Sequence, residues 1–173
     1  MQKGSNTRFS NGVIAAVITV LFIAHAVLGS ASVVAGYTSP FSVLVWVGVA
    51  LIIIHVVASI ATSREQLNDA ERPPSVRKKR HLALKWATGI VLAALAILHV
   101  ALPKGSSAGV ALVMALIVAL AVHLWVGSKS LLKDIGIDVR YKAVFRGVIC
   151  IFALACIVAI IMGLSGVVGG VNA

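Results

Sequence analysis

Charged residues are scarce in this chain, and acidic ones are the scarcest. Only 12% of the 173 residues are charged, with five Asp and Glu against 15 Lys and Arg, whereas 60% are apolar. Soluble domains have about a quarter of their residues charged, so the composition argues against a soluble enzyme, a disordered chain or a nucleic-acid partner. Cysteine is scarce as well: Cys150 and Cys156 lie in one apolar run and make neither a disulfide framework nor a CxxC metal motif.

Long apolar runs dominate instead. A membrane-spanning helix needs about 20 mostly apolar residues, and five runs qualify. None contains Asp or Glu, and their only Lys or Arg is Lys85. The first run is too long for the apolar core of a signal peptide. The sequence therefore predicts an all-α membrane protein, one transmembrane domain over 1–173, with helices 1–4 as an antiparallel bundle and spans near 12–35, 41–62, 82–102, 108–127 and 147–168.

Basic residues predict the orientation of the chain. With five spans, 14 of the 15 Lys and Arg fall on one side of the membrane, and only Lys104 falls on the other. Basic loops favour the cytoplasm, so we expect a multi-pass protein of the cytoplasmic (inner) membrane with a cytoplasmic N-terminus. The run Arg77-Lys78-Lys79-Arg80 is either part of this topogenic bias or a docking surface for a soluble partner or anionic lipid.

Histidine is almost the only ionisable residue within the spans. His25, His55, His99 and His123 lie in the first four spans, one in each, and the fifth has none. At 1.5 Å per residue from the cytoplasmic ends, His25 and His99 lie at roughly 20 Å, whereas His55 lies at roughly 11 Å and His123 at roughly 6 Å. They sort into an outer pair and an inner pair, each drawn from alternating helices.

Paired histidines facing each other across a bundle are typical ligands of haem iron. Two protein ligands on the iron favour electron transfer over oxygen binding. Zinc fits less well, because it usually takes four clustered ligands. The pattern therefore predicts two bis-histidine haems, His25 with His99 and His55 with His123, while one haem or none remain alternatives.

Four basic groups flank the expected depth of the inner haem. Lys85, Lys129 and Arg146 are candidates for pairing with haem propionates, and His81 is a weaker one. Each has a plainer interpretation, topogenic charge for the first three and a solvated interfacial side chain for His81.

The segment His123–Gly136 carries a more specific pattern. It resembles the signature of the cytochrome b membrane anchor of succinate dehydrogenase and fumarate reductase, the succinate:quinone oxidoreductase family, although Lys129 stands where Arg is commoner. Lys85-Trp86 with Gly89 and the downstream His99 resembles a second family pattern. The signature residues present are His123, Trp125, Gly127, Lys129, Leu131, Asp134 and Gly136.

The resemblance implies a di-haem electron-transfer subunit of a quinone-linked enzyme complex. Its partners would be a flavoprotein subunit and an iron–sulfur subunit on the cytoplasmic face, where the succinate or fumarate chemistry takes place. The family implies the same two histidine pairs, two b-type haems and a quinone, menaquinone, near the outer haem. Polar candidates for the quinone site are Tyr37, Thr38, Ser39 and Lys104.

Two other functions fit part of the sequence. The chain could be the cytochrome b subunit of another membrane oxidoreductase, such as a hydrogenase, although the His123–Gly136 segment argues against it. It could also be a haem-free transporter with histidine proton relays, but a relay is expected to include acidic partners and the spans hold none.

Overall fold

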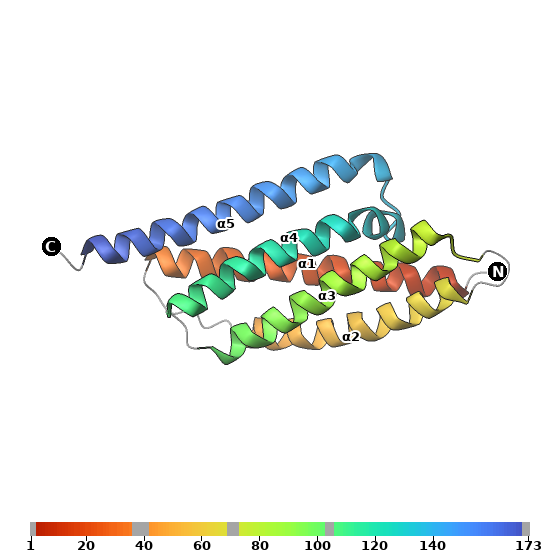
Figure 1. Cartoon of the computed structure of the whole chain (residues 1–173), viewed down its shortest axis with the longest axis horizontal. Coiled ribbons are helices and arrows are strands. Elements are labelled where there is room, and N and C mark those ends of the chain that lie inside the picture. Colours follow the sequence, from red (N-terminus) through yellow and green to blue (C-terminus); the bar gives the residue numbers. More distant parts are fainter. Residues whose placement is uncertain (1–2, 36–41, 69–72, 103–105, 171–173) are drawn as a thin grey trace.

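The computed structural model describes residues 3–35, 42–68, 73–102 and 106–170, and the described residues form helices without any β-strand (Figure 1). Five of these helices are long and apolar enough to cross a membrane, as predicted. A short 3₁₀ helix precedes the last of them. The elements are α1 (Lys3–Ala35), α2 (Ser42–Leu67), α3 (Val76–Ala101), α4 (Ser107–Asp134), η1 (Val139–Tyr141) and α5 (Lys142–Gly170).

Local sequence explains where two of the helices begin. The hydroxyls of Ser75 and Ser106 accept hydrogen bonds from the backbone N–H of Lys78 and Gly109 and so cap α3 and α4. Every helix also continues past its predicted span at the polar end, since polar side chains limit burial in hydrocarbon but do not stop helical hydrogen bonding. The apolar runs therefore predict where the helices lie but give lengths that are too short.

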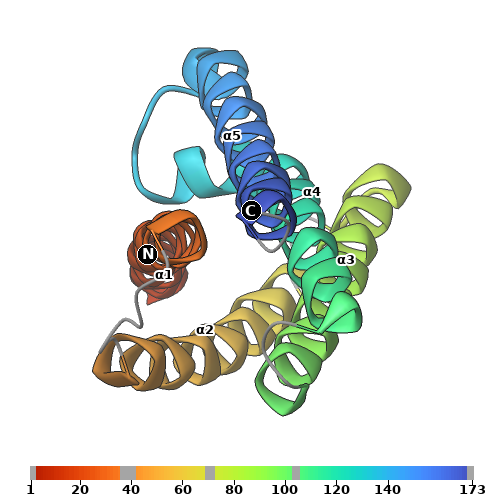
Figure 2. The ribbon, with the colours of Figure 1, turned by 90° about the vertical axis from the view of Figure 1, so that its left-hand side faces the viewer.

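The helices pack side by side in a defined order. α1 contacts α2, α4 and α5, and α4 contacts α3 and α5. Figure 2 shows the consequence: α3 lies at one edge of the molecule beside α4, α1 lies at the other edge, and α5 packs on both α4 and α1. α2 and α3 are linked by a hydrogen bond from Trp86 Nε1 to Ser63 Oγ, 3.1 Å long.

The packed core is small, and large apolar side chains face outwards. One cluster of buried residues, Ile117, Cys156 and Ile160, joins α4 to α5 and has Ala26 of α1 against it. Trp46 is 71% exposed and Ile151 is also 71% exposed. A surface of this kind is stable against lipid rather than water, in keeping with the lengths of the helices.

The start of α1 lies against the end of α4. A Cβ atom at Gly12 would stand 3.0 Å from both Asp134 Cβ and Ile135 Cγ2. Gly136 follows directly with φ +80°, a conformation that glycine adopts without steric cost, and it allows the chain to leave α4 towards η1. Glycine at position 12 is therefore what permits the close approach of the two segments.

We expect Gly12→Ala to destabilise the protein and Gly48→Ala to be neutral or slightly stabilising. The added methyl group at position 12 would overlap α4, and overpacking of this kind costs about 1–3 kcal/mol. At Gly48 nothing lies within 4 Å of the added atom. SDS-induced unfolding of both variants in mixed micelles measures the difference, and equal stabilities would show that α1 does not pack on α4 in this way.

Candidate functional site

The imidazole of His123 on α4 is held by two consecutive residues of α3. Its Nδ1 lies 3.0 Å from the hydroxyl oxygen of Thr88. A Cβ atom at Gly89 would stand 3.3 Å from His123 Cε1, so a side chain at that position would crowd the ring. The absence of a side chain at Gly89 lets the α3 backbone come close to the imidazole and limits how the ring can turn.

The Thr88 hydroxyl has three partners within hydrogen-bonding distance. They are the Leu84 carbonyl at 2.9 Å, the Lys85 carbonyl at 3.1 Å and His123 Nδ1 at 3.0 Å. When the hydroxyl donates to its own helix, its oxygen accepts a hydrogen bond from Nδ1–H of His123. A neutral imidazole protonated at Nδ1 has its lone pair on Nε2, the form that binds metal ions.

His55 on α2 is the second imidazole of this region. Its Nδ1 is buried and finds no hydrogen-bond partner among the residues that the structure describes. The ring lies close enough to His123 for the two imidazoles to interact electrostatically. A buried polar nitrogen left without a partner is costly, so it points to a partner that the chain itself does not supply.

Lys85 places a positive charge beside both imidazoles. Its Nζ donates a hydrogen bond to Ser130 Oγ, 2.8 Å away on α4, and its side chain is partly buried. It acts electrostatically on His55, His123 and Asp134. Of the four predicted propionate partners, Lys85 is the one that both faces the two imidazoles and is anchored by a hydrogen bond to α4.

Arg146 of α5 is anchored on the end of α4. Its Nε donates to Ser128 Oγ at 2.9 Å, and its Nη2 donates to the Trp125 carbonyl at 3.0 Å. The guanidinium carbon also lies 4.5 Å from the centre of a Trp125 ring, a cation–π contact. Ser128 is completely buried and donates a hydrogen bond to the Trp125 carbonyl. Two hydrogen bonds and the ring contact therefore hold the Arg146 guanidinium in place.

The remaining predicted site residues are dispersed. His25 and His99 are both partly buried, on α1 and α3, whereas His81 and Lys129 are exposed. The expected quinone residues, Tyr37, Thr38, Ser39 and Lys104, lie outside the described residues. The structure thus brings His55, His123 and Lys85 together, and Lys85 also acts electrostatically on the exposed His81 ring.

Sequence reasoning missed the side chains that orient this site. Thr88 was not singled out, because a hydroxyl within an apolar span is usually satisfied by its own helix. Ser128 and Ser130 were not singled out because they follow the predicted end of the fourth span at residue 127. Thr88 does carry one signal: it lies three residues after Lys85 and therefore on the same face of α3. Gly89 was noticed as part of a pattern, but its contact with His123 depends on how α3 packs on α4.

The chemistry available here suits a cofactor that needs few protein ligands. Among the described residues, no group of three or more His, Cys, Asp or Glu side chains could hold a metal ion. A haem iron needs only two, because the macrocycle supplies four nitrogens. Two imidazoles that interact electrostatically, with the cation of Lys85 acting on both, fit that requirement.

No family model, no curated protein and no solved structure matches the chain. Its function is therefore inferred from the residues and contacts described above.

We expect Arg146→Ala to destabilise the protein by about 1–3 kcal/mol, since it removes two charged hydrogen bonds and the contact with Trp125. Arg140→Ala is the matched control. Its side chain is 73% exposed and pairs only with Asp138 and the neighbouring Tyr141 ring, so a change within about 0.5 kcal/mol is expected. Unfolding of both variants in SDS micelles tests this. An Arg146 variant as stable as the control would contradict the anchoring role.

Proposed function

We propose that this chain is the cytochrome b membrane anchor of a quinone-linked oxidoreductase, of the succinate dehydrogenase and fumarate reductase kind. In this proposal α1–α4 form an antiparallel bundle that binds two b-type haems, with the N-terminus in the cytoplasm. His55 and His123 ligate the inner haem, and His25 and His99 ligate the outer one. When bound, haem iron supplies one-electron transfer between membrane quinone, here menaquinone, and the soluble subunits.

The state of the inner imidazoles carries this proposal. His123 is oriented through Nδ1 by Thr88, which leaves the lone pair of Nε2 available. Outer-sphere hydrogen bonds of this kind hold metal-bound histidines in one tautomer and orientation. His55 presents a buried Nδ1 that finds no partner among the described residues. Both imidazoles are thus in a condition suited to binding iron, and they lie near each other.

Other residues around the inner pair also fit a haem. Gly89 removes bulk beside the His123 ring, where a side chain would meet it at 3.3 Å. Lys85 would hold a propionate, since its Nζ already binds an oxygen of α4 and is near both imidazoles. This assigns positioning to Thr88 and Gly89, ligation to the two histidines, and charge compensation to Lys85.

The observed helix bounds support the pairing by depth. Counted from the helix ends that carry the basic residues, His25 lies about 33 Å from Lys3 and His99 about 34 Å from Val76. On the same count, His55 lies about 18 Å from Leu67 and His123 about 16 Å from Asp134. The members of the inner pair therefore agree more closely than the shorter predicted spans had indicated, and the members of the outer pair agree as closely as before.

The distribution of charge supports the proposed orientation of the chain in the membrane and its proposed soluble partners. Residues 77–80 at the start of α3 are all basic and all exposed. Basic residues at the membrane surface favour the cytoplasmic side. This exposed run is a suitable contact for the flavoprotein and iron–sulfur subunits of the complex.

The proposal is tested by purifying the chain with its native partners and recording a dithionite-reduced minus oxidised spectrum with a haem count. We expect a b-type spectrum and two haems per chain. An intact, folded complex without haem would overturn the electron-transfer function. One haem would mean that one histidine pair is structural.

Substitution of single histidines separates the two sites. We expect His25→Ala or His99→Ala to remove the outer haem and to leave most of the inner haem, because the outer haem loses an axial ligand. For the same reason, His55→Ala or His123→Ala should remove the inner haem and leave most of the outer haem. His81→Ala, an exposed histidine, is the control and keeps both. The haem count and reduced spectrum of each variant measure this. A different grouping of the variants would reject the pairing.

Thr88→Val should weaken binding of the inner haem about 10- to 100-fold, since the hydroxyl that orients His123 is lost and the volume is nearly kept. Thr88→Ser, which retains the hydroxyl, should behave like the original protein. Retention of the inner haem during titration with apomyoglobin, a haem acceptor, measures the effect. If Val and Ser variants lose haem equally, the hydrogen bond to His123 has no role in ligation.

A further inference from the structure

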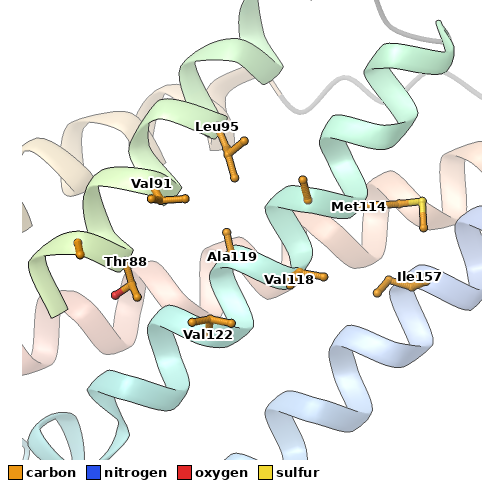
Figure 3. Close-up of a pocket in the computed structure, with 10 residues that line it drawn as sticks. Thr88, Val91, Leu95, Met114, Val118, Ala119, Val122 and Ile157 are labelled. Atoms are coloured by element: carbon orange, nitrogen blue, oxygen red, sulfur yellow. The ribbon is translucent and has the colours of Figure 1, made fainter. Parts of the chain in front are cut away.

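A long apolar groove runs along the outside of the molecule between α3 and α4. It has a volume of about 580 Å³ and an almost wholly apolar lining. Figure 3 shows Val91 and Leu95 of α3 on one wall and Ala119 of α4 on the other, with Ile157 of α5 beyond Met114. The groove adjoins the histidine site at Thr88, which lines the groove and lies 3.0 Å from His123 Nδ1.

The groove is open towards lipid and has the length of one leaflet. Val91, Val118 and Val122 are 53%, 50% and 45% exposed, so its walls face outwards. From Ala87 to Leu95 on α3 it extends over about 12 Å, close to half of the roughly 30 Å hydrocarbon thickness. An acyl chain of a single leaflet fits this extent.

Thr88 is the polar residue of the lining, and its hydroxyl already has hydrogen-bond partners within α3 and α4. These partners are the Leu84 carbonyl and His123 Nδ1. The groove therefore offers an occupant dispersion and apolar contact but no directed hydrogen bonds. Specificity has to come from the ends of the groove.

Basic groups gather at the end nearest Ala87 and Val122. The His81 ring lies within hydrogen-bonding range of the Val126 carbonyl, which brings the start of α3 against α4 at this point. The charged groups that act on that ring are Lys85, Lys129 and Arg146, and all of them are basic. Arg146 is held over Trp125, one turn of α4 beyond Val122.

These basic groups differ in what they can bind. Lys85 turns inwards to Ser130 and belongs to the histidine site. Arg146 uses two of its five N–H groups on Ser128 and Trp125, which leaves donors for an oxyanion. Lys129 is exposed and lies seven residues after Val122 on α4, two turns along the same outward face.

We propose that the α3–α4 groove and its basic mouth form a binding site for one anionic phospholipid. The acyl chain lies along Val91, Leu95 and Ala119, and the phosphate of the headgroup binds at Lys129 and Arg146. The charge of the mouth complements that headgroup, and the length of the groove matches its chain. The site would hold α3, the helix at the edge, against α4, and it does not depend on whether haem is bound.

The test uses the full chain in nanodiscs made from equal amounts of phosphatidylglycerol and phosphatidylcholine with identical acyl chains. Native mass spectrometry after release then counts the lipids retained on the protein. We expect one phosphatidylglycerol per chain in preference to phosphatidylcholine. Lys129→Gln should lower that preference about fivefold, the effect of removing one basic residue near a membrane surface.

Two further variants separate the groove from general surface charge. Arg64→Gln makes the same change of charge on α2, which contributes no residue to the groove, and should leave the preference unchanged. Ala119→Phe fills the groove and should abolish retention of both lipids. Equal retention of the two lipids, or the same loss for the Arg64 and Lys129 variants, would overturn the proposal. Retention that persists in the Ala119 variant would do so as well.

Discussion

The solvent that this chain meets is hydrocarbon, and hydrocarbon offers no hydrogen bonds. Every backbone N–H and C=O within the spans must therefore be paired inside the protein, which leaves the helix as the available form. The same constraint acts on side chains. The Thr88 hydroxyl bonds to its own helix and to His123, and Ser128 bonds to Trp125 and Arg146. Polar atoms in the bundle are consequently few, and most have an identifiable partner.

Against that background, the buried Nδ1 of His55 is informative because, with Arg8 Nε, it is one of two buried side-chain polar atoms without a partner among the described residues. The Nδ1 of its neighbour His123 has a partner in the Thr88 hydroxyl. Burying an imidazole nitrogen without a partner costs free energy, and a bound ligand would offset that cost. This reasoning, rather than any single motif, supports the proposed haem ligation.

The two faces of the α3–α4 pair divide the chemistry between them. One side holds Gly89 and His123, together with Lys85. The other side is apolar along the groove and basic at its mouth, and Thr88 belongs to both, since it lines the groove and lies against His123. Helical geometry makes the division possible, since consecutive residues such as Val122 and His123 lie about 100° apart around one helix. One helix pair can thus serve a buried cofactor and a bound lipid at the same time.

The sequence alone determined the five candidate spans and their approximate places, and it singled out the four histidines now proposed as iron ligands. These properties are local: an apolar run of sufficient length must cross the membrane as a helix, and histidine stands out where other ionisable residues are absent. Only the tertiary structure decided that Lys85 faces the imidazoles whereas Lys129 and His81 do not, and that Arg146 rests on Trp125. It also decided the partner of His123 and the groove beside α4. These features arise where two helices meet, and the rotation of one helix against its neighbour depends on packing of side chains from both, which no single stretch of sequence contains.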